Sequence, residues 1–134
     1  MLKSKLAILL TCVTLLPMLG CADVIVWFTK ERASWAFIQD RCKGITLGKI
    51  EVSSTQVSIP VNLWDHYDSG ICIYDPKGHV NEDRITISVK KGLCSGAPAE
   101  PLVVKIAKPK SGDYRIAYDD PDANFPVIGL LHVD

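Results

Sequence analysis

The stretch Arg84-Ile85-Thr86-Ile87-Ser88-Val89-Lys90 alternates polar and apolar residues. Successive side chains of a β-strand point to opposite faces, so this alternation predicts a strand whose three apolar residues face a core. Similar strand-like runs recur along the chain, separated by turn residues, at residues 24–28, 45–52, 56–59, 61–64, 71–74, 102–107, 114–118 and 127–133. Short strands at this spacing are typical of a β-sandwich or a β-barrel, so we expect a mainly β fold.

Turn sequences indicate how these strands connect. Asp75-Pro76-Lys77-Gly78 has the residues of a type I turn and predicts a hairpin between the strands on either side. Asp119-Asp120-Pro121-Asp122 separates the last two strands in the same way, and residues 95–101 have the glycine and prolines of a loop. Pro60 has no N–H group to donate, so it predicts an edge position or a break in its strand.

One segment has a different pattern. Apolar residues follow helical spacing within residues 30–43, and Gly44 fits the C-terminal end of a helix. We therefore expect one short helix in this segment. The alternative is a second strand that pairs with residues 24–28, but residues 29–32 lack the types that favour a tight turn.

The stretch Pro109-Lys110-Ser111-Gly112-Asp113-Tyr114-Arg115-Ile116 contains a turn and then a strand that opens with a tyrosine. It resembles the corner of immunoglobulin-like and fibronectin type III sandwiches, and similar Gly-x-Tyr turns occur in transthyretin-like sandwiches. The resemblance implies that Tyr114 is buried and bonds to nearby backbone, which fixes a crossover between two sheets. We expect a single antiparallel β-sandwich, immunoglobulin-like in form. The resemblance concerns architecture and implies no activity.

The N-terminal residues have the composition of an export signal. Two lysines precede an apolar run over residues 6–16, which is too short for a membrane-spanning helix of about 20 residues. The motif Met18-Leu19-Gly20-Cys21 follows and resembles the lipobox of bacterial lipoproteins. That resemblance implies that Cys21 is acylated and becomes the mature N-terminus. The alternative is ordinary signal cleavage after Ala22.

This resemblance divides the chain into a lipoprotein signal peptide, residues 1–20, and one domain, residues 21–134. The residue after the acylated cysteine is Ala22 rather than aspartate, which resembles lipoproteins sorted to the outer membrane. We therefore expect a lipid-anchored protein on the periplasmic side of the bacterial outer membrane.

Composition and charge exclude several classes of function. Hydrophobic residues make up 48% of the 134, too many for a disordered chain. Fifteen basic residues balance fifteen acidic ones, and loss of the two signal lysines leaves a net charge of −2, so no nucleic-acid partner is expected. Residues 84–110 nevertheless carry a net charge of +5, and residues 111–134 one of −4. Lys90 and Lys91, within the basic stretch, are the candidate partner-facing residues.

Three cysteines remain once Cys12 leaves with the signal and Cys21 is acylated. An exported protein enters an oxidising compartment, so we expect one disulfide. Cys42 and Cys94 both lie beside loop glycines, whereas Cys72 lies in a strand-like run, where a free cysteine packs as a small apolar residue. We therefore expect a disulfide between Cys42 and Cys94, although loop entropy alone does not distinguish it from a link between Cys72 and Cys94.

The sequence contains no clear catalytic or metal-binding motif. Asp65-His66-Tyr67-Asp68 combines two carboxylates with an imidazole, but nothing identifies a nucleophile beside them, so we expect a polar loop. The oxygen-rich residues 119–124 lack EF-hand spacing, which favours an acidic turn over a Ca²⁺ site. The sequence has no Cys-x-x-Cys motif, and its histidines are not paired. We expect no enzyme, no cofactor and no metal.

These patterns together predict a small cell-envelope lipoprotein that acts as a non-catalytic binding or assembly module. Its partners would be the membrane, through the N-terminal lipid, and a protein of the envelope, with no small-molecule substrate evident. Two alternatives stay open. One is an unlipidated periplasmic or secreted protein that binds or inhibits an enzyme, and the other is a small periplasmic enzyme.

Overall fold

The structure is a computed structural model that describes residues 29–63, 70–94, 101–122 and 124–134. Several predictions lie outside these residues: the signal peptide, Cys21, the strand at residues 24–28, the group at residues 65–68 and most of the loop at residues 95–101. Among the residues that the structure describes, no helix is long and apolar enough to cross a membrane.

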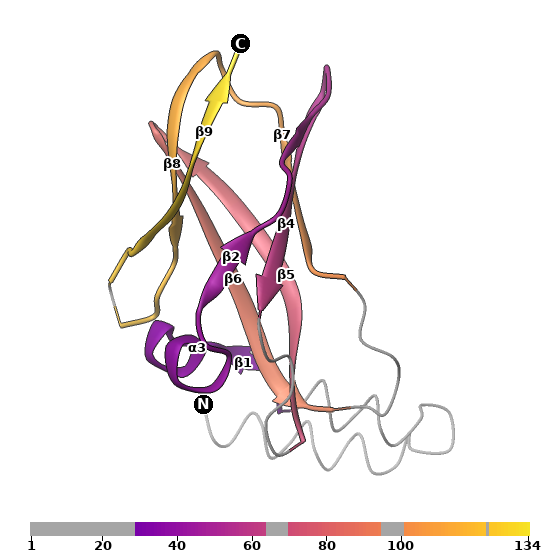
Figure 1. Cartoon of the computed structure of the whole chain (residues 1–134), viewed down its shortest axis with the longest axis vertical. Coiled ribbons are helices and arrows are strands. Elements are labelled where there is room, and N and C mark those ends of the chain that lie inside the picture. The colour runs from indigo at the N-terminus through magenta and orange to yellow at the C-terminus, as the bar shows by residue number, and fades with distance from the viewer. Residues whose placement is uncertain (1–28, 64–69, 95–100, 123) are drawn as a thin grey trace, which may run out of the picture.

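Strands dominate the fold and form two sheets (Figure 1). The first sheet contains β1 (Glu31–Arg32), β5 (Ile71–Asn81), β6 (Arg84–Leu93), β8 (Gly112–Tyr118) and β9 (Val127–Val133). The second sheet contains β2 (Ile45–Leu47), β3 (Glu51–Val52), β4 (Gln56–Leu63) and β7 (Val103–Ala107). The helix α3 (Trp35–Arg41) lies at the lower end in Figure 1. The prediction of a mainly β fold is confirmed.

Strand β6 is central in the first sheet. β5 pairs with one edge of β6 as an antiparallel hairpin, while β1 and β8 pair with the other edge. β8 runs parallel to β6, so the expectation of a purely antiparallel fold is wrong for this sheet. Parallel neighbours need a crossover between them, and here the chain passes through β7 in the second sheet before β8 begins.

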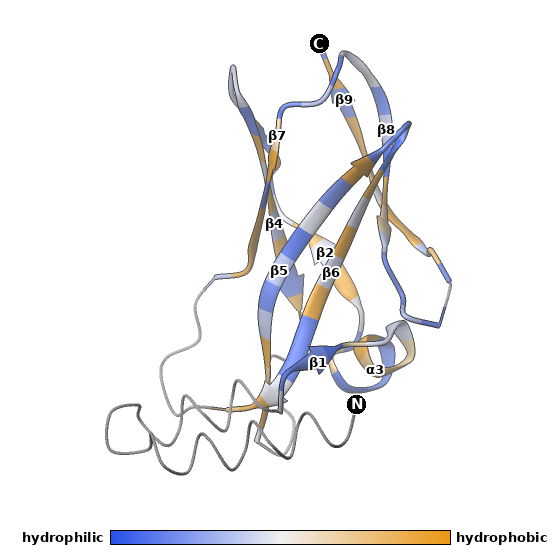
Figure 2. Cartoon of the chain, turned by 180° about the vertical axis from the view of Figure 1, so that it is seen from behind, coloured by the Kyte–Doolittle hydropathy of each residue, from blue (hydrophilic) through white to orange (hydrophobic). Residues whose placement is uncertain are grey.

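The alternation that predicted β6 also determines which of its side chains are buried. Ile85, Ile87 and Val89 are at most 1% exposed, as predicted, and Figure 2 shows alternate hydrophobic and hydrophilic bands along this strand. The second sheet contributes Val57 and Ile59, both 0% exposed, to the same apolar core. Burial of these branched side chains, each worth about 1.5–3 kcal/mol, favours the two-sheet arrangement.

Glycines allow the edges of the two sheets to approach closely. A Cβ atom on Gly78 of β5 would lie 2.5 Å from Cγ1 of Val104 and 2.8 Å from Cγ2 of Ile106, both on β7. On the opposite side, a Cβ atom on Gly129 of β9 would lie 2.6 Å from Cδ1 of Leu47 on β2. A side chain at either glycine would therefore push the sheets apart.

The predicted turn at Asp75-Pro76-Lys77-Gly78 is wrong. These residues lie within β5, where a register shift in the pairing with β6 accommodates the proline. The chain turns instead at Glu82, which has a φ of 54°. The long ladder between β5 and β6 thus outweighs the local preference of a Pro-Lys-Gly sequence for a turn.

Pro60 neither ends nor interrupts its strand, contrary to the prediction. Its carbonyl oxygen accepts a hydrogen bond from the Gly48 N–H group at 2.9 Å, while the N–H group of Val61 donates to Leu102 on the opposite side, also at 2.9 Å. The N and C=O groups of one strand residue point to the same edge. The proline nitrogen therefore faces the gap where β2 gives way to β3, and the ladder loses no hydrogen bond there.

The predicted helix is confirmed, within narrower bounds than residues 30–43. The first residues of this segment pair with β6 as β1, and α3 begins after Ser34. The Ser34 side chain accepts a hydrogen bond from the Phe37 N–H group at 3.1 Å, which satisfies one of the free donors of the first turn. At the other end, the N–H group of Gly44 bonds to the carbonyl of Ile38 at 3.1 Å, as expected of a terminating glycine.

The disulfide joins Cys72 to Cys94 with a Cα–Cα distance of 5.0 Å, so the predicted link from Cys42 is wrong. The pairing of β5 with β6, extended by a bond from the Cys94 N–H group to the Gly70 carbonyl (2.8 Å), brings these two cysteines together. Cys42 instead lies buried at the end of α3. Its neighbour Gly44 serves the helix end rather than a disulfide loop.

Tyr114 forms the predicted corner. It is 7% exposed, and its hydroxyl group donates to the backbone carbonyl of Lys110 at 2.6 Å. This bond spans the connection from β7 in the second sheet to β8 in the first. The corner thus fixes the crossover that makes β8 a parallel neighbour of β6.

Candidate functional site

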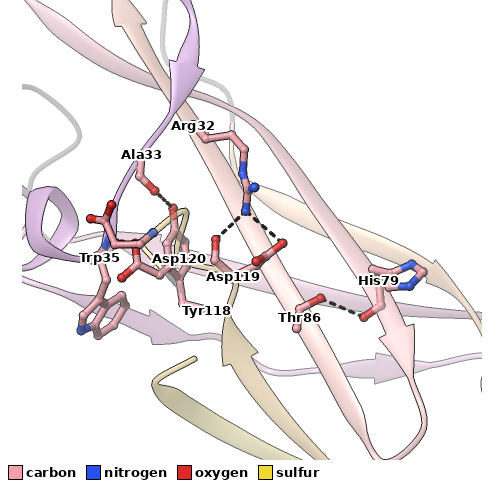
Figure 3. Close-up of polar contacts among 9 residues, drawn as sticks. Arg32, Ala33, Trp35, His79, Thr86, Tyr118, Asp119 and Asp120 are labelled. Carbon is pink, nitrogen blue, oxygen red and sulfur yellow. Dashed lines mark hydrogen bonds and ion pairs between the residues drawn. The ribbon is translucent and has the colours of Figure 1, made fainter. Parts of the chain in front are cut away.

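Figure 3 shows polar contacts where residues 32–35, hereafter the N-terminal segment, meet the end of β8. The Tyr118 side chain is fully buried, and its hydroxyl group donates to the backbone carbonyl of Ala33. The ring of Trp35 packs against that of Tyr118 with 5.4 Å between centroids. Burial raises the pKa of Tyr118 to about 12, so the phenol stays protonated and remains a donor. This tyrosine attaches α3 to the sheet.

Asp119, which follows Tyr118, holds the same segment through contacts with Arg32. The guanidinium Nη2 atom lies 2.9 Å from a carboxylate oxygen of Asp119 and donates to its backbone carbonyl at 2.7 Å. Both side chains are partly exposed, and exposed ion pairs contribute about 1 kcal/mol or less. We therefore assign this pair to the orientation of β1 rather than to catalysis.

Asp120 is a buried carboxylate, 4% exposed, that accepts hydrogen bonds from the Trp35 N–H group (3.1 Å), the Asp122 N–H group (3.2 Å) and the Asn124 side-chain amide (3.3 Å). Burial alone would raise its pKa, but these hydrogen bonds and the charge of Arg32 outweigh burial and lower it. The carboxylate is thus occupied by protein donors. In the part of the chain that the structure describes, no cluster of His, Cys, Asp and Glu residues could hold a metal ion.

Lys90 and Lys91, the candidate partner-facing residues, lie at the α3 end of β6. Lys91 Nζ is 3.2 Å from a carboxylate oxygen of Glu31 and 4.4 Å from the ring centroid of Phe37, so it is engaged within the molecule. Lys90 is partly buried, opposite Arg32 and Tyr74 in the ladder. A role of the two lysines in partner binding stays a prediction.

His132 connects two acids of the acidic C-terminal stretch. Its Nδ1 atom lies 2.6 Å from a carboxylate oxygen of Asp113, and its Nε2 atom lies 3.1 Å from one of Asp134. The hydrogen bond to Asp113 raises the pKa of His132 above its ordinary value. The imidazole is 64% exposed, whereas acid–base catalysis requires a desolvated pair in a pocket, so this cluster reads as a surface ion-pair network.

An open groove of about 690 Å³ lies between the ends of β5 and β7 and the crossover to β8. Its size falls within the roughly 300–1,000 Å³ of ligand-binding sites. His79 lines it from β5, and Lys105 lines it from β7. Lys108 and Lys110 lie on the crossover that Tyr114 fixes. Figure 1 places the β7–β8 crossover and the β5–β6 turn at the end of the molecule away from α3.

The groove, hereafter the basic groove, is positively charged. Its three lysines and His79 face one acidic residue, Glu82, among the groove-lining residues. All five side chains belong to exposed residues. None of the four basic side chains forms an ion pair with another residue in the described ranges. The charge of the three lysines is therefore available to an anionic ligand.

Sequence reasoning found only part of this site. The basic stretch at residues 84–110 included Lys105, Lys108 and Lys110. The sequence prediction nevertheless assigned partner contact to Lys90 and Lys91, which lie at the opposite end of the molecule. His79 and Glu82 were missed because they belong to another strand, and only the approach of β5 to β7 brings them beside the lysines. No local signal in the sequence indicates that approach except Gly78, whose missing side chain permits it.

A comparison of the chain with protein-family models, with curated proteins and with solved structures finds no match. The basic groove is therefore the candidate functional site on the strength of its own geometry and charge.

Proposed function

We propose that this chain is a small lipoprotein of the bacterial cell envelope, anchored on the periplasmic side of the outer membrane through acylated Cys21. The lipobox-like motif Met18-Leu19-Gly20-Cys21, directly after a short apolar run, supports the anchor. The disulfide between Cys72 and Cys94 supports an oxidising compartment.

The domain itself acts as a non-catalytic binding or assembly module for a protein of the envelope. One observation carries this proposal: the basic groove presents three lysines without ion-pair partners among the described residues. The exposed setting of His132 and Asp113 argues against this pair as a catalytic pair, since catalytic pairs work where water is excluded.

We further infer that the two sheets form an immunoglobulin-like β-sandwich. Their shared core and the corner at Tyr114 support this architecture. The parallel pairing of β6 with β8 departs from the all-antiparallel form and reflects the crossover through β7.

Replacement of Cys21 by serine tests the anchor. Cys21→Ser removes the acylated atom, so the protein should leave the membrane fraction, because stable attachment needs the acyl chains. The control is Cys12→Ser, which changes a cysteine within the expected signal and should leave the protein in the membrane fraction. Fractionation with mass spectrometry of the N-terminus measures both.

An unmodified N-terminus at Asp23 in the natural chain, with both the natural chain and Cys21→Ser in the soluble fraction, would contradict the anchor. That result would favour the alternative of an unlipidated periplasmic or secreted binding protein.

A further inference from the structure

We propose, building on the binding role inferred above, that the basic groove binds an extended acidic peptide segment of an envelope protein. The segment would lie in the open groove along the outer edges of β5 and β7, with its carboxylates toward the lysines. Four features of the structure lead to this ligand class: free strand edges, unpaired positive charge, the place of the lysines, and the position of the groove in the molecule.

The groove lies between two strands that each end a sheet. In the described part of the chain, β5 pairs with β6 on one side only, and β7 pairs with β4 on one side only. An edge strand presents backbone N–H and C=O groups that can pair with an added strand. An extended peptide satisfies such groups along its length, whereas a sugar chain or a phosphate does not. The free edges therefore favour a peptide.

The two halves of β5 differ in how well they suit strand addition. The half near the disulfide contains the register shift after Tyr74, the proline and a residue with a left-handed φ, Asp75 at 51°. Bulges and prolines protect an edge from pairing. From Lys77 to Asn81 the ladder with β6 is regular, and it is this half that lines the groove. The protected half and the groove therefore do not coincide.

The charges select an acidic ligand. The groove is lined by His79, Lys105, Lys108 and Lys110. Glu82 is the one acidic residue among the groove-lining residues. Side chains on one face of an extended peptide recur about every 6.6–6.8 Å, so carboxylates at alternate positions would all face the lysines.

Lysines on an edge strand can also serve only to prevent aggregation. That role explains Lys105, which lies in β7. It does not explain Lys108 and Lys110, which lie on the crossover after β7 has ended. These two lysines extend the positive charge beyond the strand, along the path of a bound segment.

The position of the groove argues against lipid headgroups of the anchoring membrane. The described chain begins near β1 and α3, whereas the β7–β8 crossover and the β5–β6 turn lie at the opposite end (Figure 1). Residues of both segments line the basic groove. A domain tethered through its N-terminus would thus direct the groove away from the bilayer and toward the periplasm.

The test is fluorescence anisotropy of the purified full chain with a fluorescein-labelled eight-residue peptide of alternating glutamate and valine. Two further peptides share its design: one has lysine in place of glutamate, and the other is N-methylated at alternate amides. Polygalacturonate serves as an anionic competitor that is not a peptide. The protein variants are Lys105→Glu/Lys108→Glu and the control Lys43→Glu/Lys49→Glu, which makes the same charge change at exposed lysines outside the groove.

We expect the acidic peptide to bind, and the groove variant to lose at least tenfold in affinity while the control stays within twofold. We expect the lysine peptide not to bind and the N-methylated peptide to bind at least fivefold more weakly, because methyl groups block strand addition. Higher salt should weaken binding, since the charges are exposed.

Two results would overturn the inference in distinguishable ways. If N-methylation has no effect, or polygalacturonate displaces the peptide completely at equal charge concentration, the groove binds anions but not a peptide strand, and the binding role proposed above survives. If neither the acidic peptide nor polygalacturonate binds, or if both double variants lose affinity equally, the groove is not a binding surface. The proposed binding role then loses its support as well.

Discussion

Removal of the hydroxyl group should destabilise the fold more at Tyr118 than at Tyr114. Tyr118 is 0% exposed, and Tyr118→Phe would leave the buried Ala33 carbonyl without this donor. A buried acceptor without a partner costs about 1–3 kcal/mol, and full burial places this site near the upper end, at about 2–3 kcal/mol. Tyr114→Phe removes a bond to the Lys110 carbonyl that is only partly buried, so a smaller loss of about 1 kcal/mol is expected.

Urea unfolding followed by circular dichroism measures both variants against the natural protein. With a urea m-value of about 1.5 kcal/mol/M, the midpoint should fall by about 1.5 M for Tyr118→Phe and by about 0.7 M for Tyr114→Phe. The two variants make the same chemical change, so they control for each other. Equal losses, or a larger loss at Tyr114, would refute the assignment of Tyr118 as the buried attachment of the N-terminal segment.

Two further predictions concern the disulfide and the surface histidine. Replacing Cys72 and Cys94 by serine should lower the free energy of unfolding by about 3 kcal/mol, since the disulfide closes a loop with a sequence separation of 22. A reducing agent should destabilise the natural protein but not the double variant. Equal sensitivity of the two proteins to the reducing agent would contradict the assigned pair. An NMR titration of His132 should give a midpoint above 6.5 that falls in Asp113→Asn, because the hydrogen bond to Asp113 favours the charged imidazole. The stability that this pair contributes is fully present below pH about 6.5 and is lost as the pH rises through the raised folded-state pKa. An unshifted NMR midpoint would show that the contact between His132 and Asp113 does not persist in solution.

Local features of the fold were predictable from the sequence. The alternation in Arg84–Lys90 identified the three buried side chains of β6, because strand periodicity acts within a few residues. The Tyr114 corner was predictable for the same reason: its hydrogen bond reaches back only to Lys110. The helix was predictable from its apolar spacing and from Gly44, which bonds to the helix end.

Features that depend on distant parts of the chain were not predictable. Asp75-Pro76-Lys77-Gly78 has the composition of a turn, but its pairing with β6 is set by the whole hairpin. The disulfide partner of Cys94 depends on which strand lies beside it, and neighbouring glycines do not indicate that. The basic groove requires β5 of one sheet to meet β7 of the other, and no pattern within either strand predicts the meeting.

The most direct test of the central claim, that this domain works by binding through the basic groove, is an NMR map of the binding site. The ¹⁵N-labelled protein would be titrated with the unlabelled acidic peptide, and the amide shifts of all residues followed. We predict that the largest changes fall on His79–Glu82 and Lys105–Lys110, with little change in α3 or around Lys43. Changes centred on α3, on Lys90 and Lys91, or spread evenly over the surface would contradict the account.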